Sequence, residues 1–288
     1  MSTGTGGVVS SGTGTDSGTG TGSGTRTRSR APRGGVRAAA TDSLLIAGRN
    51  LTVLRRLPQL LVFATIQPVL FVLMFRYVFG GAITIPGVSY VNYLMPGIFA
   101  QTVAFGALTT GIGLAEDLAK GLIDRFRALP MARSAVLAGR TLADLVRNVG
   151  VVALMVAVGY LVGFRVQTSL WSLLAAVLVL LLFGFAMSWV FALVGLSVPN
   201  AEGAQAASFP ILFPLVFASS AFVPTSTMPG PLRAFAEHQP VTAVVDAVRA
   251  LVLGGPTSSA VLTSLAWSVG ILLVAAPLAV RRYRRATG

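Results

Sequence analysis

Residues with the chemistry for catalysis or metal binding are scarce in this chain. It has no cysteine, a single histidine, His238, and a single lysine, Lys120. A zinc site needs several Cys, His or acidic ligands, and no nucleophile lies beside His238, so we expect a solvated histidine in a loop. Lys120 is not part of a Gly-Lys-Ser/Thr phosphate-binding loop. We therefore expect no His/Cys metal site and no ATP hydrolysis by this chain alone.

Carboxylates in the middle of an apolar span would indicate proton or ion coupling. The nine acids are Asp16, Asp42, Glu116, Asp117, Asp124, Asp144, Glu202, Glu237 and Asp246. None falls near the middle of a span predicted below. Glu202 follows Asn200 at a predicted helix start, where a negative charge is favourable. This pattern argues against a proton-coupled carrier, which stays the alternative.

In the charged stretch from residue 116 to residue 147, the spacing of apolar residues predicts a short amphipathic helix. Its apolar face consists of Leu122, Ile123, Phe126 and Leu129, and Pro130 follows. Lys120, Asp124 and Arg127 occupy the other side, where they can pair three or four residues apart. An exposed apolar ridge needs a surface to dock on. That surface is either the membrane or a groove in a partner protein.

The elements that must position these residues are membrane spans. The chain has 288 residues, of which 54% are hydrophobic and 11% charged, against about 25% charged in soluble domains. A span needs about 20 largely apolar residues. Six stretches meet this requirement: residues 58–79, 92–114, 145–164, 171–197, 204–223 and 259–280. We predict an all-α integral membrane protein with six transmembrane helices.

The distribution of basic residues predicts the orientation, because cytoplasmic segments carry the excess of Arg and Lys. With six crossings, 18 of the 22 basic residues fall on one side: eight before the first span, six in the central loop and four at the C-terminus. The other side keeps Arg76, Arg165, Arg233 and Arg249. Both termini are therefore predicted to be cytoplasmic. Orientation also accounts for the net charge of +13, so we expect no nucleic-acid partner.

Two further regions lie outside the spans. Residues 1–40 are rich in Gly, Ser and Thr, which predicts a disordered cytoplasmic tail. Residues 41–57 have helical apolar spacing after a Thr-Asp cap, which indicates an interfacial helix or a cytoplasmic extension of the first span. The external region 224–256 is proline-rich and includes an apolar helical face at Val244, Val248 and Leu251. It is too short to cross, so we expect a re-entrant or surface-lying helix.

In the third predicted span, Gly159 and Gly163 stand four residues apart. Such a pair permits close helix contact in membranes. In a chain with 32 glycines, chance spacing is an equally good explanation.

Several motifs resemble a known family. They are Gln67-Pro-Val-Leu-Phe-Val-Leu73, Tyr93-Leu-Met-Pro-Gly97, Gly121-Leu-Ile-Asp-Arg-Phe-Arg-Ala-Leu-Pro130 and the segment from Gln239 to Leu251. These resemble the membrane subunits of type-2 ATP-binding-cassette exporters, above all the daunorubicin-resistance permeases of actinobacteria. The similarity covers about residues 42–285, so the Gly/Ser/Thr tail lies outside it.

The resemblance implies a multi-pass permease of the bacterial plasma membrane that exports an antibiotic-like, hydrophobic or amphipathic molecule. It implies a separate ATP-binding subunit, which binds ATP and Mg²⁺, and a second permease copy or close homologue. Residues 41–57 would be the connecting helix, and residues 224–256 an external re-entrant pair. The residues that would couple to the ATP-binding subunit are Gly121, Leu122, Ile123, Asp124, Arg125, Phe126, Arg127, Leu129 and Pro130. The alternatives are a permease for lipids or glycans, a proton-coupled secondary carrier and a membrane scaffold.

Overall fold

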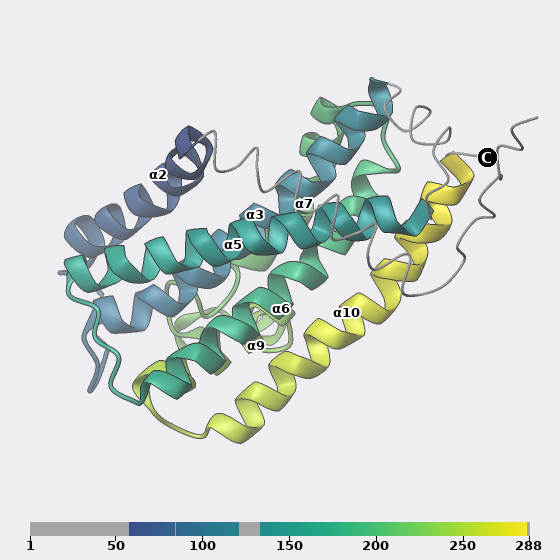
Figure 1. The fold of residues 1–288 in the computed structure, drawn as a ribbon. Helices are drawn as coiled ribbons and strands as arrows, with labels where there is room; N and C mark the ends of the chain where they lie inside the picture. Colours follow the sequence, from purple (N-terminus) through teal and green to yellow (C-terminus); the bar gives the residue numbers. More distant parts are fainter. Residues whose placement is uncertain (1–57, 84, 121–132, 287–288) are drawn as a thin grey trace, which may run out of the picture. The chain divides into compact units, whose positions relative to one another are not determined.

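The described part of the chain is entirely helical. A computed structural model describes residues 58–83, 85–120 and 133–286 (Figure 1), and within these ranges no β-strand occurs. The elements are α2 (Pro58–Met74), a π-helical turn η1 (Phe75–Phe79), α3 (Tyr90–Ala119), α5 (Arg133–Val162), α6 (Leu170–Gly195), α7 (Ala201–Phe217), a 3₁₀ turn η2 (Thr225–Thr227), α8 (Gly230–Glu237), α9 (Pro240–Leu253) and α10 (Thr257–Ala286). The predicted all-α class is confirmed for these residues.

Four described helices are long and apolar enough to cross a membrane. They are α3, the part of α5 from Asp144 to Val162, α6 and α10 up to Arg285. Two shorter apolar helices, Thr65–Phe79 and Ala201–Phe217, coincide with the first and fifth predicted spans. Helices therefore occupy all six predicted stretches, whereas six crossings and the position of the termini stay predictions.

Helix α7 ends earlier than predicted, at Phe217 instead of residue 223. Ser219 stabilises the end of the helix through two hydrogen bonds. The Ser219 hydroxyl donates to the carbonyl of Val216 at 2.6 Å and accepts from the amide of Ala221 at 3.1 Å. These bonds offer the backbone an alternative to the helical ladder. Residues 218–223 consequently form turns that contact α3 and α9.

The central charged region is more helical than predicted. Helix α3 continues to Ala119 and α5 begins at Arg133, so helices extend into both ends of the stretch 116–147. Residues 121–132, with the predicted coupling helix, lie outside the described residues, as do the N-terminal tail and the predicted interfacial helix.

Helices α3 and α6 form the centre of the packing. A Cβ atom on Gly111 of α3 would lie 2.3 Å from the carbonyl oxygen of Phe191, and one on Gly195 of α6 would lie 2.1 Å from that of Gly111. The two backbones therefore touch without intervening side chains. Gly159, from the predicted glycine pair, also permits close packing, because its Cβ would meet the Met95 side chain at 2.8 Å. Gly163 instead follows the end of α5 with a φ of +103°.

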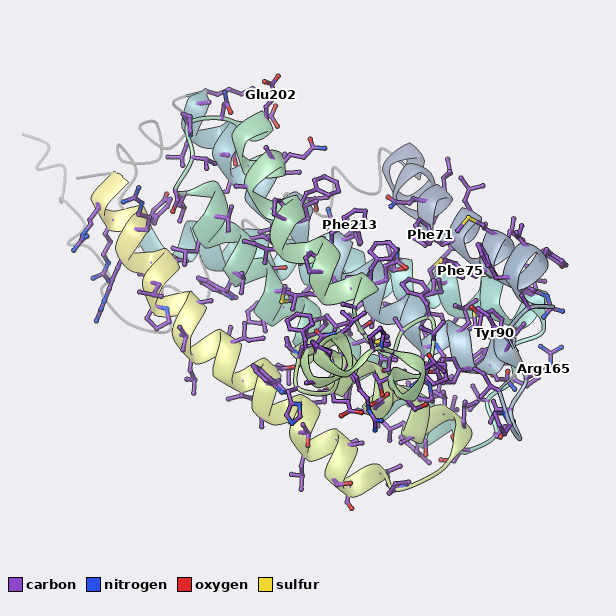
Figure 2. The ribbon with its side chains drawn as sticks, turned by 180° about the vertical axis from the view of Figure 1, so that it is seen from behind. Phe71, Phe75, Tyr90, Arg165, Glu202 and Phe213 are labelled. Carbon is purple, nitrogen blue, oxygen red and sulfur yellow. The ribbon has the colours of Figure 1, made fainter. Side chains whose placement is uncertain are left out.

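The helix ends gather at two levels. Leu114 of α3, Leu196 after α6 and Tyr283 of α10 belong to one buried apolar cluster. At the other level, the amide of Arg165 donates to Asn92 Oδ1 at 2.9 Å, and the amide of Gln167 to the carbonyl of Val252 at 2.8 Å. Figure 2 shows Glu202 near one of these ends and Tyr90 with Arg165 near the other.

The region 224–256 forms η2, α8 and α9. Helix α9 packs against α3, α6 and α10, and its predicted apolar face (Val244, Val248 and Leu251) is buried. The helix ends at Gly254, whose φ of +94° suits glycine. His238 is exposed at the end of α8, where its Nδ1 lies 2.9 Å from the carbonyl oxygen of Ala234. The exposure of the side chain agrees with the predicted solvated histidine.

Candidate functional site

A polar cleft lies between α2, α3, α5 and α7. Its volume is about 290 Å³. The lining residues are Gln67, Pro68, Gln101, Thr102, Phe105, Gly106, Leu108, Thr109, Arg147, Asn148, Val151, Gln205 and Phe209. Many polar side chains thus converge within helices that are otherwise apolar. Polar groups inside membrane helices are rare and usually mark a substrate or ion path, so we take this cleft as the candidate site.

The charged side of the cleft is held by a small network between α3 and α5. Arg147 donates from one guanidinium nitrogen to the carbonyl of Gly106 at 2.8 Å, and it lies 3.4 Å from Asp144 Oδ1. The Thr110 hydroxyl donates to the other oxygen of Asp144. Both charged side chains are largely buried, with exposed fractions of 20% for Arg147 and 15% for Asp144. The pair is therefore compensated, and Arg147 is fixed at the wall of the cleft.

Two amides in the cleft have unused hydrogen-bonding capacity. Gln101 and Asn148 are each 3% exposed, and neither Gln101 Oε1 nor Asn148 Nδ2 has a partner among the described residues. An unpaired buried polar group costs about 1–3 kcal/mol. Gly106 leaves room for Asn148, because a Cβ there would lie 2.8 Å from Asn148 Oδ1, which would then have to shift. The arrangement therefore presents one acceptor and one donor that a bound molecule or water can satisfy.

Beside the cleft runs a row of phenylalanines from α2, η1, α3, α7 and the turn after α7, which we call the aromatic row. Its members are Phe105, Phe209, Phe213, Phe217, Phe222, Phe75 and Phe71. Successive ring centroids lie 4.6 Å apart for Phe213 and Phe217 and 5.4 Å apart for Phe217 and Phe222. Phe213 is 46% exposed, and Figure 2 shows it between Glu202 and the pair Phe71 and Phe75. The row offers aromatic faces next to the polar groups.

Together the cleft and the aromatic row suit a molecule with a polar part and an apolar or aromatic body. Among the described residues, no three His, Cys, Asp or Glu side chains are grouped so that they could hold a metal ion. The site offers hydrogen bonding, the positive charge of Arg147 and aromatic contact.

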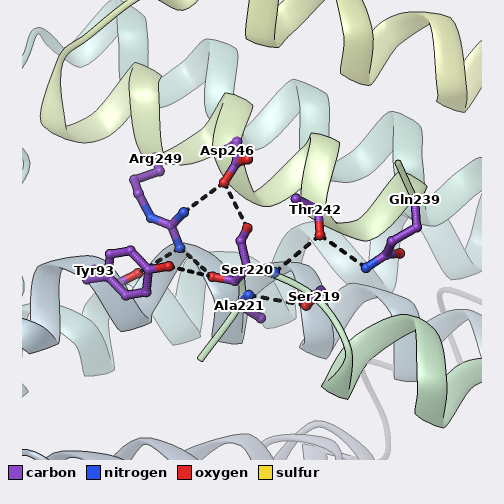
Figure 3. Close-up of polar contacts among 8 residues, drawn as sticks. All are labelled: Tyr93, Ser219, Ser220, Ala221, Gln239, Thr242, Asp246 and Arg249. Carbon is purple, nitrogen blue, oxygen red and sulfur yellow. Dashed lines mark hydrogen bonds and ion pairs between the residues drawn. The ribbon is translucent and has the colours of Figure 1, made fainter. Parts of the chain in front are cut away.

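A second polar cluster fixes α9 near the N-terminal end of α3, beside Tyr93 (Figure 3). Arg249 forms an ion pair with Asp246 at 2.8 Å and donates to the carbonyl of Ser220 at 2.8 Å. Its guanidinium carbon lies 3.8 Å from the centre of the Tyr93 ring. The Ser220 hydroxyl donates to Asp246, and its amide donates to the hydroxyl of Thr242. This cluster ties α3, α9 and the turn after α7 together.

The predicted coupling residues 121–130 lie outside the described residues, so the structure neither assembles nor separates them. Only their border is described. Lys120 caps the end of α3 and its Nζ lies 2.6 Å from Glu116 Oε1, a hydrogen bond that raises the pKa of the lysine.

Sequence inspection missed Gln101 and Asn148, and treated Arg147 only as a loop cation. The available signal was the presence of polar residues inside apolar stretches. That signal does not show which polar residues meet, because their convergence depends on how α3 packs against α5.

Comparison with known proteins gives consistent matches. The family model for ABC-2 type transporters matches residues 43–253. The daunorubicin resistance ABC transporter permease protein DrrB1 of Streptomyces coeruleorubidus is 36% identical over 86% of this chain and 88% of its own length. The probable doxorubicin resistance ABC transporter permease protein DrrC of Mycobacterium tuberculosis is 30% identical over 88% of this chain and 92% of its own. A putative transport permease, ycf38 of Cyanophora paradoxa, is 25% identical over 73% of each chain.

Proposed function

This chain belongs to the ABC-2 type transporter family, and we propose that it is the permease subunit of an ATP-driven exporter for amphipathic small molecules. The observation that carries the proposal is the cleft with its unpaired amides beside the aromatic row, in a chain 36% identical to a drug-resistance permease over most of its length.

The helical arrangement supports a membrane location with the basic ends together. Leu114, Leu196 and Tyr283 share a cluster, so the C-terminal ends of α3, α6 and α10 lie at one level. Arg284 and Arg285 follow Tyr283 on α10, and Lys120 follows Leu114 on α3, so these basic residues lie beyond this level. Under the rule for basic residues this end faces the cytoplasm. Residues 121–132 and the C-terminus would then share one side of a bacterial plasma membrane.

The motor in this proposal is a separate ATP-binding subunit, which would bind ATP and Mg²⁺. The amphipathic segment 121–130 is the proposed contact, with Ile123 and Phe126 on its docking face. A second permease copy or close homologue would complete the complex. ATP binding would favour one state of the assembly through its differential affinity for the two states, and hydrolysis would reset it.

The proposed substrate has an apolar, partly aromatic body and hydrogen-bonding groups. Two of these relatives are named for resistance to daunorubicin and doxorubicin, which supports an antibiotic-like substrate here. Gln101 Oε1 would accept a hydrogen bond from it and Asn148 Nδ2 would donate one, while Phe209 and Phe213 would contact its rings. Pairing these amides with the substrate would offset the free-energy cost of their burial.

The test is ATPase stimulation in proteoliposomes that contain this chain and its ATP-binding subunit, across a panel of amphipathic compounds. Asn148→Ala and Gln101→Ala should each raise the half-maximal concentration of a stimulating compound about tenfold, the worth of one hydrogen bond. Ser268→Ala is the matched control. Its hydroxyl is also buried and without a described partner, but it lies on α10 outside the cleft.

Three results would contradict the proposal. Equal effects of Ser268→Ala and Asn148→Ala would show that the cleft does not select the compound. Transport that persists without any ATP-binding subunit and collapses with the proton gradient would indicate a secondary carrier. Binding of the ATP-binding subunit without flux of any compound would indicate a scaffold.

A further inference from the structure

An apolar groove runs between α6 and α10, apart from the polar cleft. Its volume is about 800 Å³, and Val190, Leu193, Trp267, Ile271, Val274 and Leu278 line it with smaller residues. Trp267 is 40% exposed and Val274 63%. Gly270 widens the groove, since no atom lies within 4 Å of a Cβ placed on it. The groove is thus open along its length and has room for a hydrocarbon chain.

Two basic residues, Arg281 and Arg285, lie at the C-terminal end of α10 on the same helix face as the groove residues. Positions 267, 270, 274, 278, 281 and 285 are three or four residues apart, so they share one helix face. Arg281 and Arg285 stand seven residues after Val274 and Leu278, about 10 Å along the axis. Both are exposed. Among the described residues, neither has a carboxylate within ion-pair distance.

The rotation of α10 about its axis is fixed by Tyr283. Two residues along a helix point roughly 200° apart, so Tyr283 faces away from Arg281 and Arg285. Its side chain is 3% exposed and belongs to the cluster with Leu114 and Leu196. Since Tyr283 is held in the protein, Arg281 and Arg285 must face outward, in line with the groove. The side chains of Arg282 and Arg284 point roughly 80–100° away from this direction, one on each side.

We infer that the groove binds one acyl chain of an anionic phospholipid whose phosphate contacts Arg281 and Arg285. A hydrocarbon chain matches the apolar lining, and a phosphate at the bilayer surface complements two cations without protein partners in the described part of the chain. Arginine suits this role because its guanidinium binds phosphate oxygens in pairs. A neutral lipid would fill the groove but leave the two charges uncompensated. The site therefore selects by head-group charge, independently of the transported molecule.

The experiment uses the full-length chain in nanodiscs of phosphatidylcholine with increasing fractions of brominated phosphatidylglycerol or brominated phosphatidylcholine. Bromine quenches tryptophan on contact. The chain has three tryptophans; Trp171→Phe removes the most exposed one, and Trp189 is only 7% exposed. The remaining accessible reporter is Trp267 in the groove. Quenching should occur at a lower mole fraction of the anionic lipid than of the neutral one.

Arg281→Gln and Arg285→Gln should each reduce this preference about fivefold, the effect of one basic side chain at a membrane surface. Arg282→Gln, which removes the same charge beside the groove line, should change it less than twofold. Gly270→Leu should reduce quenching by both lipids, because a Cβ at this position meets no atom within 4 Å and the longer side chain would occupy the groove.

Equal quenching by the two lipids would overturn the inference, as would an equal effect of Arg282→Gln and Arg281→Gln. Protection of Trp267 from both lipids in a chain that runs as a dimer would also overturn it, since a second copy would then cover the groove.

Discussion

Replacing Arg249 and Asp246 in turn should separate two contributions to the stability of the cluster in Figure 3. One is the contact of Arg249 with backbone carbonyls and the Tyr93 ring, and the other is its ion pair with Asp246. The guanidinium donates to the carbonyls of Ser220 at 2.8 Å and Tyr93 at 3.3 Å, stacks on the Tyr93 ring and pairs with Asp246. The exposed fraction is 16% for the Arg249 side chain but 47% for Asp246. The carbonyl and ring contacts are thus the better shielded, whereas water screens the ion pair.

The magnitudes follow from this burial. Arg249→Met removes the hydrogen bonds of Arg249 to two carbonyls, at about 1–1.5 kcal/mol each, although the Ser220 carbonyl keeps the Tyr93 hydroxyl as a donor. It also removes a cation–π contact of about 0.5–2 kcal/mol. The total is about 2.5–5 kcal/mol. Asp246→Asn keeps an acceptor oxygen for Arg249 and Ser220 and loses about 1 kcal/mol of screened attraction. For a chain of this size, about 1 kcal/mol corresponds to roughly 2–4 °C, so we expect melting points about 10 °C lower for Arg249→Met and about 3 °C lower for Asp246→Asn.

Thermal unfolding in detergent, followed by intrinsic tryptophan fluorescence, measures both variants. The chain has no cysteine for thiol dyes, but Trp189 is buried and reports exposure of the core on unfolding. Arg249→Lys should fall between the two variants, because an ammonium group lacks the planar fork that reaches both carbonyls. If Asp246→Asn destabilised as much as Arg249→Met, the ion pair would dominate and the ranking by burial would be wrong.

Three further predictions concern other parts of the chain. Gly195→Ala should lower the melting point, because its Cβ would lie 2.1 Å from the Gly111 carbonyl oxygen and overpacking costs about 1–3 kcal/mol; an unchanged melting point would mean that α3 and α6 separate freely. Phe126→Ala should abolish export and ATPase stimulation while membrane insertion persists, and wild-type export would contradict the coupling role. The hydrogen bond from Arg233 lowers the pKa of Glu237, so Arg233→Gln should raise that pKa toward its ordinary value in an NMR titration, and an unchanged midpoint would contradict the pairing.

Much of the fold could be predicted from apolar length alone. The stretches 92–114, 171–197 and 259–280 correspond to α3, α6 and α10 within a few residues, except that α3 and α10 extend five to six residues further at their C-terminal ends. Both extensions include charged residues, and hydropathy does not detect a helix that continues beyond the apolar layer. The early end of α7 was equally hidden, since it depends on hydrogen bonds of Ser219 with its neighbours.

The candidate site was harder to predict because its parts are distant in the sequence. Gln101 and Asn148 come from different helices, and each alone resembles an isolated polar residue in a span. What brings them to one cleft is the packing of α3 on α5, where Gly106 leaves space for Asn148. Periodicity identifies the face of a single helix but does not specify which faces of two helices meet.

The length of α3 has a mechanical consequence. At 30 residues it measures roughly 45 Å, and it joins the segment 121–132 to the turn after α7, where Tyr93 donates to the Ser220 carbonyl at 3.1 Å. Its one interior proline, Pro96, removes a backbone bond close to that far end. The helix is therefore uninterrupted by proline from residue 97 to its C-terminal end, and bending is easiest near Pro96. A displacement of the C-terminal end, next to residues 121–132, would be transmitted along the helix as far as Pro96 before bending could absorb it.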